Sequence, residues 1–162
     1  DGFNSVKLDY NLKFLNIGLG SAKKIKVEFE FDFKYYFNLI NKNNTEIESD
    51  IYKFSIADTN VGFIVKNIGN AFVGNLLSKN LKSNFNYILP VSIENNKFEI
   101  KVPESIIYIN SILILQHLNN ENLKSKPFDL NFGLKLKYLD VGNKERTVKY
   151  KIRFTKAMPK SC

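Results

Sequence analysis

The chain has 162 residues, a formal net charge of +8 and a pI near 9.4. Its hydrophobic content of 44%, with 14% aromatic residues, is enough to build a core and excludes an intrinsically disordered class of protein. The length is that of one ordinary domain, and we expect a single domain over residues 1–156 followed by a flexible tail at 157–162.

Cysteine content and hydropathy limit the covalent and membrane options. Cys162 is the only cysteine, which excludes an intramolecular disulfide. No run approaches the roughly 18 apolar residues of a membrane span, and no signal peptide is recognisable. Because the chain begins at Asp1 rather than Met, we expect a processed form or a piece of a longer protein.

The N-terminal third alternates between apolar and charged residues, which is typical of half-buried strands. The pattern predicts strands over Val6–Phe14 and Ala22–Asp32, separated by a glycine-rich turn. We expect Tyr35–Ile40 to continue the second strand after a bulge. The polar run 41–45 is then a loop tip.

The middle third is less regular. Short strands are predicted over Ile51–Ala57 and Val61–Lys66, with a turn at 58–60 between them. Leucine and phenylalanine spacing in Ala71–Asn84 favours a short helix or an irregular crossover. A strand follows over Phe85–Ile93, at a sheet edge or broken at its proline, and a tight turn predicts a hairpin with Phe98–Val102.

The last third contains the most apolar run and the clearest hairpin. We expect a helical turn over Glu104–Tyr108, a buried strand over Ile112–Gln116 and a polar loop over 119–126. Alternating residues in 132–138 and 148–154 flank a turn of glycine, aspartate and asparagine at 140–143. This arrangement predicts a long β-hairpin.

The predicted elements indicate an all-β fold. About eight or nine closely spaced strands, with one or two short helical segments, favour an antiparallel β-sandwich. An open barrel is the alternative, and the absence of regular βαβ alternation argues against a parallel sheet.

Combinations of residues that carry out catalysis or bind metals are scarce. His117 is the only histidine and lies after an apolar run, so a partly buried structural role is the simpler interpretation. One histidine and one terminal cysteine cannot assemble a usual zinc site within one chain. Two carboxylate clusters, Glu28/Glu30/Asp32 and Glu46/Glu48/Asp50, lack a calcium-loop pattern. We therefore expect no catalytic residue, no metal and no cofactor.

The C-terminal hairpin carries a basic stripe. Alternation places five cations on its outward side, namely Lys135, Lys137, Lys149, Lys151 and Arg153. They form a candidate site for a polyanion such as nucleic acid or an anionic surface. Two structural interpretations compete with this one: lysines on exposed strands oppose edge pairing, and the charge can be compositional. By parity Tyr138 and Tyr150 face inward, so this side offers no ring for base stacking.

Several short motifs resemble those of a known class of domain. Asn16-Ile17-Gly18-x-Gly20-Ser21-Ala22, Tyr87–Pro90 with Ile100–Pro103, and the turn Tyr138–Gly142 resemble segments of immunoglobulin-like β-sandwich domains in uncharacterised bacterial proteins, many of them membrane-anchored. The resemblance implies an immunoglobulin-like sandwich with a membrane-tethered or accessory role. On this ground an extracytoplasmic or tethered location is slightly favoured over a cytoplasmic one. It brings no catalytic residues.

The functional expectation is a non-enzymatic binding module. Its partner is expected to be a protein, and a homo-oligomer formed through an edge strand is possible. The alternative is a domain that binds nucleic acid or an anionic surface through the basic hairpin. No small-molecule substrate is indicated by the sequence.

Overall fold

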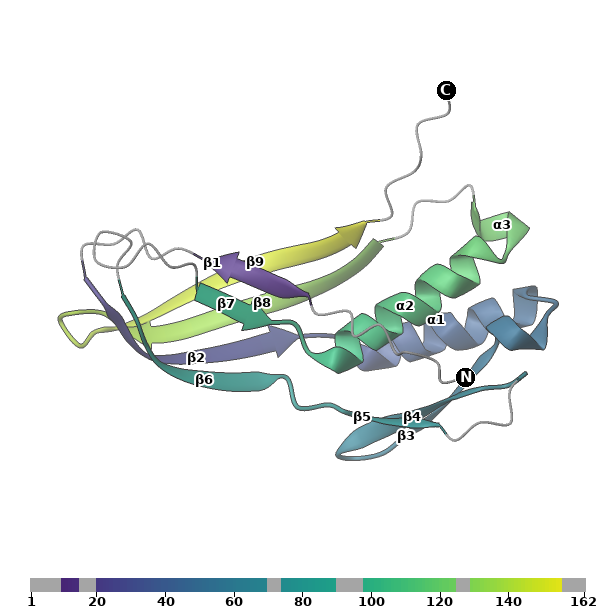
Figure 1. Cartoon of the computed structure of the whole chain (residues 1–162), viewed down its shortest axis with the longest axis horizontal. Helices are drawn as coiled ribbons and strands as arrows, with labels where there is room; N and C mark the ends of the chain where they lie inside the picture. Colours follow the sequence, from purple (N-terminus) through teal and green to yellow (C-terminus); the bar gives the residue numbers. More distant parts are fainter. Residues whose placement is uncertain (1–9, 15–19, 70–73, 90–97, 125–128, 156–162) are drawn as a thin grey trace, which may run out of the picture.

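A computed structural model describes residues 10–14, 20–69, 74–89, 98–124 and 129–155. Within these residues the chain forms nine strands, three α-helices and one 3-10 helix. In chain order they are β1 (Asn11–Phe14), β2 (Ala22–Glu30), α1 (Phe33–Glu46), η1 (Asp50–Tyr52), β3 (Phe54–Asp58), β4 (Gly62–Asn67), β5 (Asn75–Ser78), β6 (Lys82–Ile88), β7 (Phe98–Lys101), α2 (Glu104–Leu118), α3 (Glu121–Lys124), β8 (Asp129–Leu139) and β9 (Glu145–Thr155). The molecule is elongated, with long strands at one end and the helices at the other (Figure 1).

The largest sheet has four antiparallel strands in the order β6-β2-β8-β9. Its central strand β2 buries Ile25, Val27 and Phe29, which are 1%, 1% and 4% exposed, while the residues between them face outward. The predicted alternation of this strand is confirmed. A bulge interrupts the pairing with β8 near Lys24, whose φ of 49° lies in the left-handed region.

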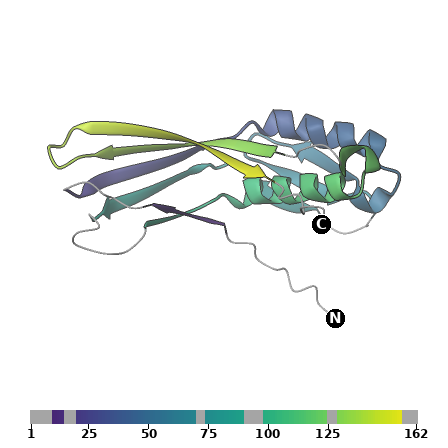
Figure 2. The ribbon, with the colours of Figure 1, turned by 90° about the horizontal axis from the view of Figure 1, so that it is seen from above.

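A second, two-stranded sheet of β1 and β7 covers part of the inner face of the four-stranded sheet (Figure 2). Aromatic rings join the two layers: the Phe14 and Tyr150 ring centroids are 5.4 Å apart, and those of Phe85 and Phe98 are 4.7 Å apart. Such pairs add to the free energy gained from burying the rings. This end of the molecule therefore consists of two packed β layers.

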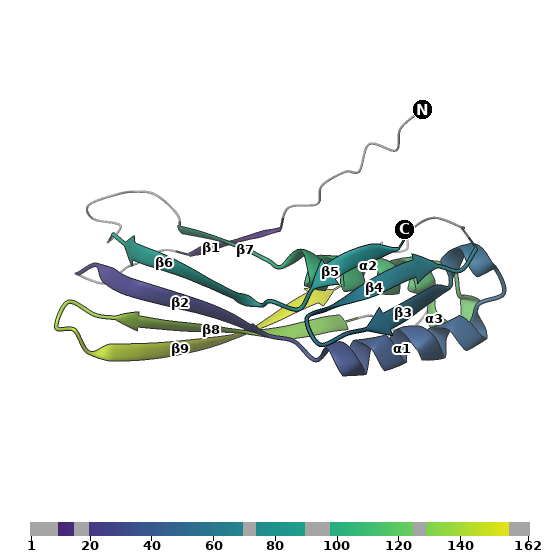
Figure 3. The same cartoon turned by 90° about the horizontal axis from the view of Figure 1, so that it is seen from below.

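At the other end, the three-stranded sheet β3-β4-β5 packs against helices α1 and α2 (Figure 3). Phe63 of β4 is fully buried, and its ring lies 5.3 Å from Phe33 and 4.9 Å from Phe37 of α1. The buried amide of Gln116 on α2 donates to Asn44 Oδ1 (2.8 Å) and accepts from Asn43 Nδ2 (3.2 Å), both on α1. These contacts fix the two helices against each other.

The prediction of a strand over Tyr35–Ile40 and a loop over 41–45 is wrong, because helix α1 covers both segments. The side chain of Asp32 caps this helix by accepting a hydrogen bond from the Tyr35 backbone N–H (2.9 Å). The buried residues Tyr36, Phe37 and Ile40 have helical spacing. Aromatic residues suit strands by propensity, but here the helical pattern of burial decides the structure.

The prediction of a separate buried strand over Ile112–Gln116 is also wrong. Helix α2 runs without interruption from Glu104 to Leu118 and is buried on most of its circumference. A helix that is buried on most sides has no continuous polar face. The helical spacing of its apolar residues is therefore hard to recognise in the sequence. The predicted polar loop over 119–126 contains the short helix α3.

Two further segments differ from the prediction, one in its secondary structure and one in its pairing partner. The proposed helix or crossover over Ala71–Asn84 contains strand β5 and the start of β6, although residues 71–73 lie outside the described part. Strand β7 pairs with β1, in the register Leu12↔Ile100, and not with β6 as the predicted hairpin required. Sequence neighbours favour local pairing, whereas this partner is far away in the chain. Pro90 and the predicted turn at 94–97 lie outside the described residues.

The C-terminal hairpin is confirmed. Strands β8 and β9 pair along their whole length, from Asp129↔Thr155 to Leu139↔Glu145. The predominantly antiparallel β character is also confirmed, and the described strands form three sheets that do not close into an open barrel. The predicted tail at 157–162 lies outside the described residues. None of the described helices has both the length and the apolar character needed to cross a membrane.

Tyr36 connects the helical end to the four-stranded sheet. Strand β2 ends at Glu30, so it offers no backbone partner to Asn131 of β8. The Tyr36 hydroxyl takes that place: it accepts from the Asn131 backbone N–H (2.8 Å) and donates to the Asn131 carbonyl (3.1 Å). Burial raises the pKa of Tyr36, and its side chain is only 4% exposed.

We predict that Tyr36→Phe lowers the free energy of unfolding by about 1–3 kcal/mol, because it leaves the partly buried Asn131 backbone N–H without its partner. The measurement is urea unfolding followed by circular dichroism. Tyr35→Phe is the matched control, because Tyr35 is 57% exposed and its hydroxyl makes no hydrogen bond among the described residues. Equal stability of the two variants would contradict the proposed connection.

Candidate polyanion-binding face

The five predicted cations lie on one face of the four-stranded sheet. Register pairs Lys135 directly with Lys149, and places Lys151 opposite Gly133 and Arg153 opposite Asn131. The residues between them, including Leu134 and Leu136, are buried against the core. We call the opposite, outward side of β6-β2-β8-β9 the basic face. Neighbouring lysines there repel each other unless carboxylates or a bound anion offset their charge.

Two further lysines join the basic face, and sequence reasoning missed them. Lys26 of β2 lies opposite Lys137, and Lys82 of β6 lies opposite Glu28. Both come from strands outside the hairpin. Only the order of strands in the sheet brings them to the same surface, so the alternation within each strand could not reveal the grouping.

Carboxylates partly balance these cations. Glu28 lies 3.3 Å from the Lys82 Nζ and 3.9 Å from the Lys135 Nζ, and Glu145 lies 4.0 Å from the Lys137 Nζ. Arg153 is bonded to Asp129, which holds the pKa of that carboxyl below its usual value. These pairs are partly or largely exposed, and exposed ion pairs contribute little to stability. They can therefore be exchanged for another anion at small cost.

Lys26, Lys149 and Lys151 are different, because they have no carboxylate partner among the described residues. All three side chains are exposed. Lys149 faces another lysine across the ladder, and Lys26 does the same with Lys137. The basic face therefore holds cations whose charge the described part of the protein leaves uncompensated.

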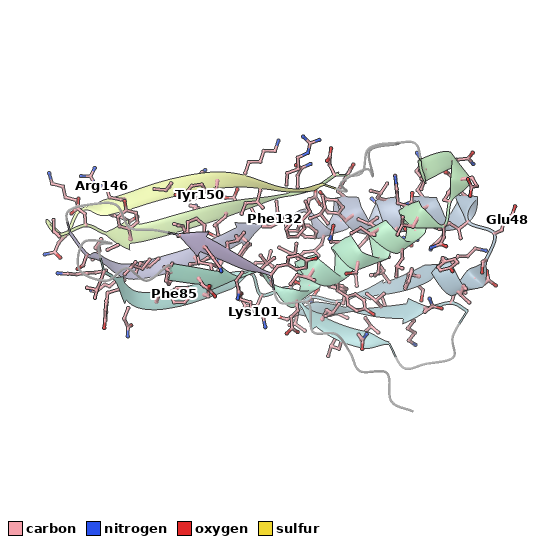
Figure 4. All side chains as sticks on the ribbon, turned by 45° about the horizontal axis from the view of Figure 1, so that its top comes forward. Glu48, Phe85, Lys101, Phe132, Arg146 and Tyr150 are labelled. Carbon is pink, nitrogen blue, oxygen red and sulfur yellow. The ribbon has the colours of Figure 1, made fainter. Side chains whose placement is uncertain are left out.

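Charge is unevenly divided between the two ends of the molecule. The strands of the four-stranded sheet, together with the turn at 140–144, contain eleven Lys and Arg against five Asp and Glu. The described residues at 31–69, 74–81 and 102–124, which form the helices and the three-stranded sheet, contain six against seven. Figure 4 shows Arg146 and Glu48 at these opposite ends. Among the described residues, the net positive charge is thus concentrated in the four-stranded sheet and its turn.

The basic face lacks aromatic rings on the two hairpin strands. Its outward positions on β8 and β9 hold polar or charged residues, a glycine and, at the end of β8, Leu139. Tyr150 instead packs on Phe14 of β1, on the inner side. Base stacking on this part of the sheet is therefore not available, and contacts with nucleic acid would be made to phosphates.

The other residues singled out in the sequence have structural positions. His117 is 5% exposed and lies in the last turn of α2. Asp32 caps α1, which separates it from Glu28 and Glu30. Glu46 ends α1 and Asp50 begins η1. The described residues contain no group of three or more histidine, cysteine, aspartate or glutamate side chains placed to hold a metal ion.

Asp140 organises the tip of the β8–β9 hairpin next to the basic face. Its carboxylate accepts hydrogen bonds from the backbone N–H groups of Gly142 (2.9 Å) and Lys144 (3.0 Å) and from the Arg146 Nε (2.9 Å). The Lys144 N–H and then Arg146 hold the pKa of Asp140 below its usual value. Asn143 adopts the left-handed conformation, with φ of 58°, that such a turn requires.

We predict that Asp140→Asn destabilises the protein at neutral pH, and that the deficit relative to the unmodified protein shrinks in acid. Because the folded-state pKa is depressed, the carboxylate stabilises the fold fully above its ordinary value of about 3.9. That contribution is lost as pH falls through the folded-state pKa. The measurement is the difference in the free energy of unfolding between the two proteins, obtained from urea unfolding at several pH values between about 7 and about 2.5. A deficit that stays constant over this range would contradict the role given to the charge.

Comparisons with known proteins give no match for this chain. No family model, no curated protein and no solved structure matches it. The resemblance to immunoglobulin-like domains therefore stays a prediction, and a function has to be argued from the chain's own residues.

Proposed function

We propose that this protein is a non-enzymatic binding module that holds nucleic-acid phosphates on the basic face of its four-stranded sheet. The observation that carries the proposal is the charge distribution: eleven cations against five carboxylates in that sheet and its turn, and near balance in the rest of the described chain. A surface with concentrated positive charge attracts polyanions and steers their approach.

The arrangement favours binding along the β8–β9 hairpin. Glu28 and Glu30 lie on β2 and repel phosphate there, whereas the outward carboxylates of the hairpin, Asp129 and Glu145, lie at its two ends. Between those ends the outward side is basic or neutral. A phosphate backbone lying along the hairpin thus contacts several lysines in succession and stays away from Glu28 and Glu30 of β2.

The contacts are expected to be independent of base sequence. Lysine ammonium groups bind phosphate as point charges, and the hairpin face offers no ring for stacking. Lys149 and Lys151, which have no carboxylate partner in the described structure, would engage first. Lys135 and Lys137 would then exchange weak, exposed ion pairs for phosphate contacts.

The immunoglobulin-like sandwich, the membrane tether, the protein partner and the homo-oligomer formed through an edge strand remain predictions. The two-layer packing of β1–β7 on the four-stranded sheet supports a sandwich at that end. Strands β6 and β9 are the edges of the larger sheet among the described strands. A phosphate-binding face does not require any of these features.

We predict that the triple variant Lys26→Glu, Lys149→Glu, Lys151→Glu loses nucleic-acid binding. The measurement is fluorescence anisotropy of labelled single- and double-stranded oligonucleotides between about 50 and about 200 mM salt. The affinity of the unmodified protein should fall steeply with salt, because binding releases counterions from the phosphates. If three contacts are lost, the logarithmic salt slope for duplex should become shallower by about 2.7.

The matched control reverses the same number of charges at the other end of the molecule, with Lys34→Glu, Lys42→Glu and Lys66→Glu. These three lysines are also exposed and lie on α1 and β4. This control should keep most of the affinity, and circular dichroism should show that both variants are folded. No binding by the unmodified protein at low salt, or equal losses in the two variants, would refute the proposal.

A further inference from the structure

An apolar cavity of about 360 Å³ lies at the strand end of the molecule, on the side of the sheet opposite the basic face. It lies between the inner face of the four-stranded sheet and the β1–β7 pair. Side chains from both layers form its wall, among them Phe14, Ile25, Phe98, Leu136, Val148 and Tyr150. Apolar cavities of this size are the usual binding places of small molecules in proteins.

The cavity follows from a mismatch in the lengths of the two layers. Strands β1 and β7 have four residues each, whereas β8 and β9 have eleven each. The short pair covers only part of the inner face. Beyond it, Val141 of the β8–β9 turn packs against Gly20, which precedes β2. The space between the short pair and this turn is lined but not filled by the described side chains.

The cavity reaches solvent and offers few polar groups. Of its lining residues, Val141 is 65% exposed and Tyr150 is 42% exposed, so a molecule can enter from this end. Ser21, Tyr138 and Tyr150, which carry hydroxyl groups, belong to the wall. Asp140 also belongs to the wall, but its carboxylate already accepts hydrogen bonds from the Gly142 and Lys144 backbone N–H groups and from Arg146. A cationic ligand would therefore find no free carboxylate in the described wall.

We propose that the cavity binds one medium-chain carboxylate, with the alkyl chain inside and the carboxylate at the opening. By proportion to an apolar cavity of about 150 Å³ that holds benzene, this one holds about fourteen non-hydrogen atoms. That suits a single alkyl chain and is too small for a two-chain lipid. Arg146 favours an anionic head group over a neutral or cationic one, because register places it opposite Tyr138 of the wall, on the cavity side of the sheet, and it is bonded to Asp140, another lining residue. This site is independent of nucleic-acid binding.

The test is isothermal titration calorimetry with decanoate, kept below the concentration at which it forms micelles. We expect saturable binding of one molecule per chain and a rise in Tm, because the ligand binds only the folded state. Decanol should bind more weakly, and decyltrimethylammonium more weakly still. Absence of decanoate binding, or tightest binding of the cation, would overturn the proposal. Binding only to phosphatidylglycerol vesicles, without binding of free decanoate, would also overturn it.

A variant with a larger side chain in the cavity wall tests whether decanoate binds in this cavity. Ala22→Phe adds a ring to the cavity wall and should weaken decanoate binding at least about tenfold, whereas Ala57→Phe on the exposed side of β3 should leave it unchanged. Equal affinity in the two variants would overturn the assignment. If Ala22→Phe does not fold, nuclear Overhauser contacts in the unmodified protein decide: contacts from decanoate methylenes to the Tyr138 and Tyr150 rings support the site, and their absence refutes it.

Discussion

The pairing of β2 with β6 on one side and β8 on the other is the constraint on which the rest of the structure depends. A strand in the middle of a sheet fixes the faces of both neighbours, since paired residues share a side. Burial of Ile25, Val27 and Phe29 therefore determines which residues of β6, β8 and β9 turn inward. Where β2 ends at Glu30, the Tyr36 hydroxyl takes over its place beside β8 and joins the helical end to the sheet.

This constraint gives the sheet two chemically different sides. The outward side collects cations from all four strands, and by register it holds seven Lys and Arg against four Asp and Glu. The inner side is apolar, and the short β1–β7 pair leaves a cavity over part of it. The two proposed activities thus belong to opposite faces of one sheet: phosphate binding on the basic face, and carboxylate binding within the layer beneath it. Substitutions on one face can be tested with little change to the other.

The parts predictable from the sequence were those governed by local alternation. Strand β2 and the β8–β9 hairpin, with its five outward cations, could be read directly, because each residue's side follows from parity. Helix α1 was missed although Asp32 and the spacing of Tyr36, Phe37 and Ile40 signalled it, since aromatic residues also suit strands. Most of helix α2 was missed because it is buried on most sides, so its sequence shows no alternation of apolar and polar faces. Pairing of β1 with β7, and the contribution of Lys26 and Lys82 to the basic face, depend on contacts distant in sequence, which no local pattern encodes.

The most direct test of the account is to map where an oligonucleotide contacts the protein. Backbone amide shifts of ¹⁵N-labelled protein would be followed by NMR during titration with an unlabelled oligonucleotide at low salt. The account predicts that shifts concentrate in β8 and β9, around Lys135, Lys149 and Lys151, with smaller changes in β2 and β6. Shifts concentrated in α1, α2 or the three-stranded sheet, or no shifts at all, would contradict it.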